Sequence, residues 1–155
     1  MPARPATERP RPTPGQDELR TWRRYLVAHA RITRALEAEL LATENLSLAS
    51  YDVLVQLSEA PGGTLRMTEL AEAVLLSRSG VTRLVERLEQ GGLVQRRPAA
   101  EDGRGVQAVI TPDGQERLRV AARTHLAGVT EHFVEPLGQQ GLGELDAALD
   151  RLLRP

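Results

Sequence analysis

The sequence predicts a mainly α-helical protein with one small β-hairpin. Three observations support this class: apolar residues recur at helical spacing along much of the chain, Ser, Thr and Pro stand where helices would begin, and one polar loop separates two short apolar stretches. The chain has 155 residues, of which 41% are hydrophobic and 26% charged, which is ordinary globular composition. We expect one folded domain over residues 16–155, preceded by a disordered Pro- and Arg-rich tail over residues 1–15.

Caps and breakers predict the order of the elements. An apolar stripe with spacings of three and four begins near Asp17 and ends before Glu44-Asn45. Ser47 and Ser77 are candidate N-caps, and Pro112 suits the first position of a helix. The expected helices cover residues 17–43, 48–59, 68–74, 78–90, 112–135 and 142–153, and Pro136 with the glycines at 138, 141 and 143 is expected to break the chain before the last one. The expected short strands cover residues 65–67, 93–94 and 106–110.

The third and fourth helices have the layout of a helix-turn-helix, because TELAEAV is joined by a short connection to the helix of SRSGVTRLVERLEQGG. At 100° per residue, the second of these helices has an apolar side suited to a core and an outer side of Arg, Ser and Thr. Such an outer side suits phosphates and base edges, although plain solvation is the alternative. The apolar side consists of Val81, Leu84, Val85 and Leu88. Because a hairpin follows directly, the arrangement predicts a winged helix with its wing within residues 96–105.

These motifs together resemble the MarR family of winged-helix transcription regulators. The matching features are ELAE, SRSGVTRLVERLE, GLVQRR, EDGRG and TPDG, and the order of the flanking helices also fits, so the resemblance covers about residues 17–153. It implies a homodimeric, sequence-specific regulator, usually a repressor, that binds a palindromic DNA operator. It also implies release from DNA by a small, often phenolic or aromatic, effector. The winged helix would span about residues 47–111, flanked by dimerisation helices at about 17–43 and 112–153.

The resemblance places the DNA contacts on the recognition helix and on the wing. The wing arginine is Arg104, which a Gly-flanked loop can carry into the minor groove, and Asp102 can brace its guanidinium. For Asp102 the alternative is a turn-forming residue. Arg96 and Arg97 are expected near backbone phosphate, with Glu86 and Glu89 facing away or pairing with Arg. The candidate DNA-binding residues are Ser77, Arg78, Ser79, Thr82, Arg83, Arg87, Arg97, Asp102 and Arg104.

Apolar stripes on the first and last helices favour a dimer, although they can also pack on their own domain. A two-fold axis would set two recognition helices about one DNA turn (roughly 34 Å) apart. The candidate dimerisation residues are Leu19, Trp22, Leu26, Leu142, Leu145, Leu149 and Leu152. The candidate effector-pocket residues are Trp22, Tyr25, His29 and Tyr51, which combine apolar faces with polar ends, and for which core or interface positions are the alternative.

Several function classes are disfavoured. The absence of cysteine excludes disulfides, thiol nucleophiles and Cys-ligated metals. His125 and His132 stand seven residues apart, about 10 Å along one helix, which is too far for one ion, so we expect no metal and no cofactor. The sequence contains no recognisable nucleophile–base pair and no phosphate-binding loop, so it does not indicate an enzyme. The formal net charge of −1 keeps one alternative open, a protein-interaction module on the same scaffold. No apolar run or signal sequence is present, so we expect a cytoplasmic, nucleoid-associated protein without a membrane partner.

Overall fold

The computed structural model describes residues 13–99 and 105–154. The chain separates into two compact units, residues 1–31 and residues 32–155. The helices and strands, in chain order, are α1 (Gln16–Glu44), α2 (Leu48–Glu59), β1 (Thr64–Arg66), α3 (Met67–Ala73), α4 (Arg78–Gln90), β2 (Val94–Pro98), β3 (Val106–Ile110), α5 (Pro112–Val129), the π-helical turn η2 (Thr130–Val134) and α6 (Glu135–Leu153), with a short 3-10 turn η1 (Pro61–Gly63) before β1. The mainly helical class and its small sheet are as the sequence predicts. The predicted tail falls mostly on residues 1–12, outside the described ones.

In the first unit, α1 begins at Gln16, within one residue of the predicted start. The Glu18 carboxylate accepts a hydrogen bond from the Gly15 backbone N–H at 2.6 Å, and negative charge here also suits the helix N-terminus. Trp22, Tyr25 and His29 follow one another along the helix, with ring centroids 5.7 Å and 6.3 Å apart. The early part of α1 therefore presents an exposed aromatic row.

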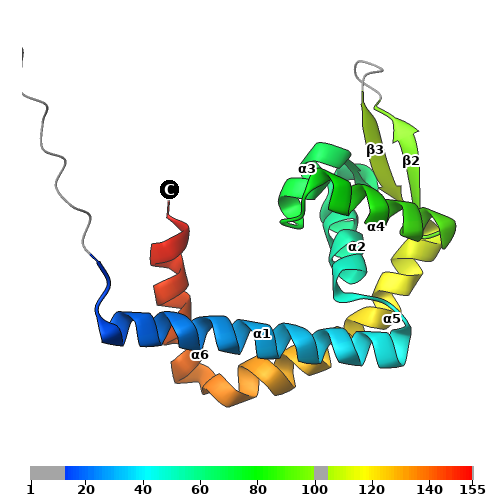
Figure 1. The fold of residues 1–155 in the computed structure, drawn as a ribbon. Coiled ribbons are helices and arrows are strands. Elements are labelled where there is room, and N and C mark those ends of the chain that lie inside the picture. The colour runs from blue at the N-terminus through cyan, green and yellow to red at the C-terminus, as the bar shows by residue number, and fades with distance from the viewer. Residues whose placement is uncertain (1–12, 100–104, 155) are drawn as a thin grey trace, which may run out of the picture. The chain divides into compact units, whose positions relative to one another are not determined.

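In the second unit, side-chain caps close three helix starts, and two of these caps, Ser47 and Ser77, are the predicted ones. The Ser47 hydroxyl accepts from the Ser50 N–H at 3.1 Å, and the Ser77 hydroxyl accepts from the Gly80 N–H at 3.1 Å. Thr111 makes the corresponding bond to the Gly114 N–H at 2.9 Å. Figure 1 shows α2, α3 and α4 gathered beside β2 and β3, while α5 leads away from this group.

The sheet has three strands, in the order β1-β3-β2, and both pairings are antiparallel. The sequence analysis expects a two-stranded hairpin with a separate minor strand at 65–67. The structure corrects this, because Leu65 pairs with Ala108 and so adds β1 to the hairpin. The first hairpin strand is also longer than expected, since Pro98 still pairs with Val106. Because Pro98 lies at the end of an edge strand, its missing N–H costs no ladder hydrogen bond.

The core forms where α2, α3 and α4 pack against the sheet and α5. The predicted apolar side of α4 is buried, as expected, and each such side chain contributes roughly 1.5–3 kcal/mol when removed from water. The fully buried large side chains include Leu40, Leu54, Leu57, Leu70, Val81, Val85 and Val94. The outer side of α4 is thereby held in a fixed direction relative to the hairpin.

Thr111 and Gly114 join the segment that follows α4 to the start of α5. The Thr111 hydroxyl donates to the Gly92 carbonyl at 2.7 Å, and the Thr111 N–H donates to the Leu93 carbonyl at 3.1 Å. Gly114 lies so close to the Leu93 carbonyl that a Cβ at this position would overlap it. The TPDG motif is therefore a clamp between α5 and the segment that follows α4.

The C-terminal helices differ from the predicted pattern. Of the four residues expected to break the chain, Gly138 alone has non-helical angles within α6, and its φ of 60° and ψ of 177° are open to glycine alone. Pro136 does not end a helix, because it lies in the first turn of α6, where a missing N–H costs nothing. The last helix consequently begins at Glu135 rather than at Leu142. Between α5 and α6 the backbone widens into the π-helical turn η2.

Candidate nucleic-acid interface and cavity

The outer side of α4 is polar and accessible. Arg78, Ser79, Arg83 and Arg87 are exposed, and Thr82 is half-buried. Since the opposite side of the helix is buried in the core, these side chains cannot turn inward without unfolding α4. The structure thus brings together, on one helix, five of the nine residues predicted to contact DNA.

Hydroxyl groups at the start of α4 already have partners within the helix. Ser77 serves as the N-cap, and its hydroxyl lies 3.3 Å from that of Ser79. The Thr82 hydroxyl donates to the Arg78 carbonyl at 2.8 Å. Because each hydroxyl oxygen keeps a lone pair, Ser79 and Thr82 retain acceptor capacity toward a donor on a base edge. The role that the structure shows for Ser77 is to cap the helix.

Arg96 on β2 is bound to two glutamates of α4. Its backbone N–H and its Nε donate to the Glu89 carboxylate at 2.9 and 2.8 Å, and its Nη1 reaches Glu86 at 3.3 Å. These hydrogen bonds lower the pKa of the Glu89 carboxyl and raise that of the Arg96 guanidinium. Glu86 and Glu89 therefore pair with a neighbouring Arg, one of the two expected arrangements. Arg96, expected near phosphate, is instead paired at the protein surface with two glutamates of the same chain.

The hairpin leads to the predicted wing. At its far end the Ala99 N–H donates to the Gly105 carbonyl at 3.2 Å, and Gly105 has a φ of 95°, which favours glycine. Arg97 on β2 is exposed and donates to the Gln95 side chain at 2.8 Å. Asp102 and Arg104, the predicted wing contacts, lie outside the described residues.

Leu75, in the turn between α3 and α4, is a residue that the sequence analysis missed. Its backbone has a φ of 54°, in the left-handed region, and its side chain is 91% exposed. Leucine in this conformation costs roughly 1–2 kcal/mol. No sequence pattern marks this position, because a pair of leucines between two helices is typical of buried packing.

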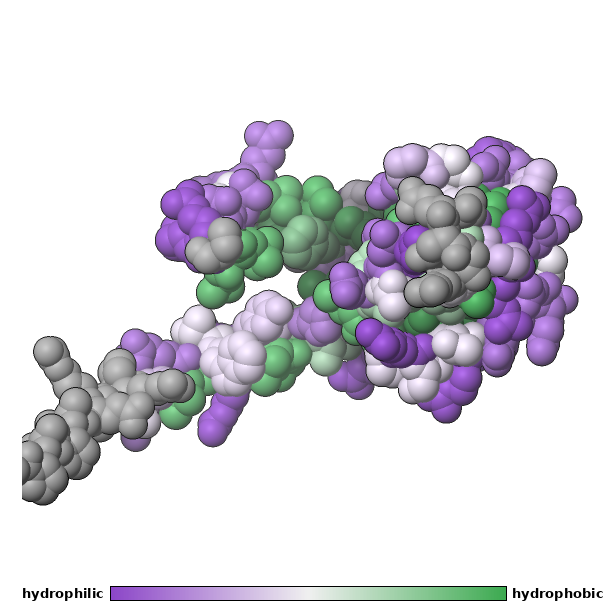
Figure 2. Space-filling view, turned by 90° about the horizontal axis from the view of Figure 1, so that it is seen from above, coloured by the Kyte–Doolittle hydropathy of each residue, from purple (hydrophilic) through white to green (hydrophobic). Residues whose placement is uncertain are grey.

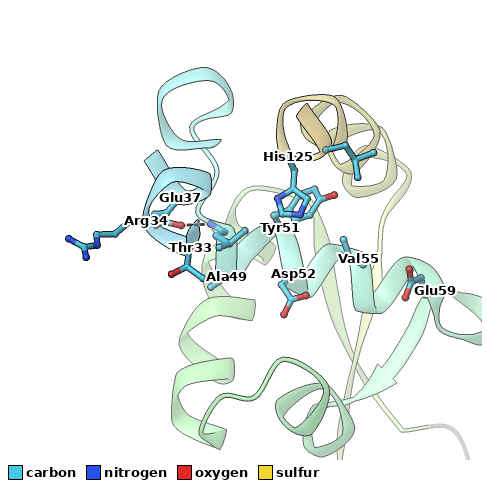
Figure 3. Close-up of a pocket in the computed structure, with 11 residues that line it drawn as sticks. Thr33, Arg34, Glu37, Ala49, Tyr51, Asp52, Val55, Glu59 and His125 are labelled. Atoms are coloured by element: carbon cyan, nitrogen blue, oxygen red, sulfur yellow. Dashed lines mark hydrogen bonds between the residues drawn. The ribbon is translucent and has the colours of Figure 1, made fainter. Parts of the chain in front are cut away.

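A cavity of about 840 Å³ lies among residues 33–37 of α1, α2 and α5. Figure 3 shows the rings of Tyr51, from α2, and His125, from α5, side by side, and their centroids are 4.4 Å apart. Apolar side chains from the same elements, including Val55 and Leu126, complete this part of the wall. Tyr51, one of the predicted effector residues, thus lines this cavity.

Burial controls the charge states of the groups around Tyr51. It raises the pKa of the Tyr51 hydroxyl, with smaller contributions from Asp52 and Glu59. Burial also raises the pKa of the Asp52 carboxyl, against a hydrogen bond from Gln56 that lowers it. It lowers the pKa of His125, whose Nδ1 is buried and has no hydrogen-bond partner among the described residues. His125 is therefore held in its neutral form.

The other predicted effector residues, Trp22, Tyr25 and His29, belong to the first unit, where they form the exposed row on the first part of α1. Sequence reasoning missed His125 and Asp52 as lining residues. A signal was present for Asp52, which is adjacent to Tyr51, but the approach of His125 depends on tertiary packing.

The two histidines near the end of α5 have different surroundings. His132, in η2, hydrogen-bonds the Glu39 carboxylate, which raises the pKa of the imidazole. Glu131 lies close by, and one ligand atom from each of these three residues falls within 4.8 Å of the others. The hydrogen bond between His132 and Glu39 already accounts for the closeness of two of these three groups.

Apolar side chains lie on the surface of the described chain, where Figure 2 shows them in green. Among the predicted dimerisation residues, Trp22 is 54% and Leu152 is 78% exposed, and Leu19 and Leu26 are also exposed. Leu142, Leu145 and Leu149 are half-buried and border a second cavity of about 440 Å³ together with Phe133. The stripes predicted on the terminal helices are thus not fully covered within one chain.

The helix-turn-helix, the three-stranded sheet and the hairpin beyond α4 define a winged helix-turn-helix protein. Residues 44–105 match the sequence model of the MarR family. The HTH-type transcriptional repressor IacR of Pseudomonas putida is 31% identical over 118 residues, which cover 72% of this chain and 69% of that protein. The chain belongs to the MarR family, whose members are DNA-binding transcription regulators and not enzymes.

Solved structures agree with this assignment. AbsC, a MarR family transcriptional regulator from Streptomyces coelicolor, superposes with a TM-score of 0.83 at 35% identity, covering 92% of this chain and 95% of that one. Sco3205, another MarR family regulator from that organism, was solved in complex with DNA. It superposes with a TM-score of 0.80 at 33% identity over 92% of this chain and 95% of that one. Within residues 13–99 and 105–154, no helix has the length and apolar character needed to cross a membrane.

Proposed function

We propose that this transcription regulator is a homodimeric repressor that binds a palindromic operator and leaves it when a small aromatic effector binds. The observation that carries the proposal is the exposed Arg, Ser and Thr side of α4, held outward by the buried apolar side of the same helix. The similarity to Sco3205, which was solved with DNA, supports DNA as the partner, and the relative IacR is named a repressor.

The proposed contacts divide into base readout and positioning. Arg78, Ser79, Thr82 and Arg83 lie toward the start of α4, the part of a recognition helix that enters the major groove. Ser77 holds this helix start, whereas exposed Arg87 and Arg97 suit backbone phosphates. Asp102 and Arg104 complete the proposal as wing residues that reach the adjacent minor groove. A protein that acts on chromosomal DNA in this way works at the nucleoid.

The dimer is proposed from the apolar side chains that one chain leaves accessible. Residues 17–43 and 112–153 would form the two-fold interface, and residues 47–111 would form the DNA-binding part. Burying exposed leucines such as Leu152 against a second copy removes apolar surface from water. A two-fold dimer then presents two copies of α4 to a palindromic site.

The test measures, by fluorescence anisotropy, how tightly the protein binds the DNA upstream of its own gene. We expect Arg83→Ala and Arg104→Ala each to weaken binding about tenfold or more while the dimer persists in analytical ultracentrifugation. Arg119→Ala is the matched control, because Arg119 is exposed on α5 and pairs with Glu116. No binding at low salt would instead support an interaction module, and mutants that bind like the unaltered protein would overturn the contact assignment.

A further inference from the structure

The cavity around Tyr51 offers one wall for an aromatic ring. Tyr51 and His125 present adjacent rings with 34° between their planes, and Val55 and Leu126 extend the apolar surface. A volume of about 840 Å³ accommodates a compound of one or two rings. The aromatic part of a ligand thus has a defined place against α2 and α5.

The charges that border the cavity are mostly negative. Asp52 and Glu59 stand two helical turns apart on one side of α2, about 10 Å along its axis. Glu37 also lines the cavity, but its carboxylate accepts the Leu48 backbone N–H at 2.5 Å and so serves the start of α2. Asp52 and Glu59 are the carboxylates that α2 contributes to the lining, and Asp52 also accepts a hydrogen bond from the Gln56 side chain.

The basic groups at the cavity do not balance these carboxylates. Arg34 belongs to the lining, yet Figure 3 shows its guanidinium directed away from Tyr51 and His125. His125 adds no positive charge, because burial lowers its pKa and keeps the ring neutral. A ligand carboxylate beside the rings would therefore meet Asp52 across a partly desolvated space, which is unfavourable.

We infer that the cavity takes a small aromatic cation, with its ring against Tyr51 and His125 and its ammonium group at the Asp52 carboxylate. The inference rests on the proposed function in one respect, since it names the chemical class of the effector. It narrows the expected class of aromatic effectors to cations, because a phenol or an aromatic acid lacks the positive charge that the Asp52 side of the cavity favours.

Binding is tested without DNA, by isothermal titration calorimetry on the full chain. The probes are 2-phenylethylamine and 3-phenylpropionate, which carry the same ring on chains of similar length but opposite charges. We expect the amine to bind at least about tenfold more tightly than the acid. Equal or tighter binding of the acid, or no binding of either probe, overturns the inference.

Two variants locate the ammonium site. Asp52→Asn is expected to weaken amine binding about tenfold and to leave the weak binding of the acid unchanged or improved. Glu72→Gln is the control, because Glu72 is exposed on α3, does not line the cavity and lies outside the proposed dimer interface. Glu59→Gln, an exposed position that folding tolerates, gives a smaller loss in the same direction and serves if Asp52→Asn does not fold. Amine binding that neither Asp52→Asn nor Glu59→Gln changes contradicts the inferred site.

Failure of this inference and failure of the proposed function give different results. If the upstream DNA binds but neither probe does, the DNA-binding function stands and the cation inference is wrong. If the amine binds and its affinity depends on Asp52 while DNA affinity is the same with and without amine, the cavity assignment stands and effector release is wrong.

Discussion

Arg96 holds Glu89 through its backbone N–H and its guanidinium at once, so a residue of the first hairpin strand is bound directly to α4. The same guanidinium reaches Glu86, which lies one turn earlier on α4. The hairpin and α4 are thereby joined by charge as well as by core packing. Arg96 is thus an arginine whose positive charge is already paired with glutamates of α4.

Arg96→Ala is expected to leave the salt dependence of operator binding nearly unchanged, because two glutamates already neutralise this guanidinium. Arg83→Ala is expected to reduce the slope of log affinity against log salt by about one contact. The measurement is anisotropy titration over a series of salt concentrations. A slope that falls equally in both variants would show that Arg96 leaves Glu89 to contact phosphate.

Leu75→Asn is expected to raise the free energy of unfolding by about 1 kcal/mol, because asparagine tolerates the left-handed backbone better than leucine. Little apolar burial is lost, since the Leu75 side chain is 91% exposed. Urea denaturation measures the change. Leu75→Ala is the control, because it removes the side chain but keeps the backbone penalty, and an equal gain in both variants would contradict the explanation.

The stability contributions of His132 and His125 are expected to depend on pH with opposite signs. The hydrogen bond to Glu39 raises the pKa of His132 above its usual 6.5, so its contribution is complete below about pH 6.5 and is lost as pH rises through the higher folded value. Burial lowers the pKa of His125, so its contribution is present above about pH 6.5 and is lost as pH falls toward the lower folded value.

Unfolding free energies of His132→Gln and His125→Gln, measured across this pH range, check the two signs. Relative to the unaltered protein, His132→Gln should lose stability mainly at the acid end. His125→Gln should make stability fall less steeply on acidification. The same sign of change in both variants would show that one of the two surroundings is wrongly described.

Gly114→Ala is expected to lower the free energy of unfolding by more than about 2 kcal/mol, because its Cβ meets the fixed backbone carbonyl of Leu93. Gly128→Ala is the matched comparison within the same helix. Its Cβ meets the flexible end of the Glu39 side chain and lies 2.8 Å from Leu36, so it is expected to cost less. Thermal and urea denaturation of both variants test the order, and a larger cost at Gly128 would contradict it.

Much of the winged helix could be predicted because local signals and burial agree there. Ser47, Ser77 and Thr111 each stand just before an amphipathic segment, and each caps a helix in the structure. The third strand was not predicted as part of the sheet, because Thr64–Arg66 is too short to show alternation and is held by its partner β3. The C-terminal break could not be placed at Gly138 from the sequence, because Pro136, Gly141 and Gly143 are helix-breaking residue types as well, although they lie within α6.

The candidate sites show the same division. The accessible side of α4 follows from helical period alone, so Arg83 and its neighbours could be placed from the sequence. The sequence does not identify Glu89 as the partner of Arg96, because this pairing depends on how β2 packs against α4. His125 was considered as a metal ligand and not as a wall of the cavity, since its approach to Tyr51 exists only in the folded chain.

The clamp at Thr111 also has a mechanical consequence. His125 lies about 21 Å further along α5 at 1.5 Å per residue, so a rigid tilt of about 3° about the clamp moves it by only about 1 Å. In the opposite direction, a compound that displaces His125 by this amount turns the helix through a small angle at its clamped end, where the Thr111 hydroxyl bonds the Gly92 carbonyl. A displacement at His125 is thus passed to Gly92 as a small rotation of α5 about the clamp, with little translation of the segment that follows α4.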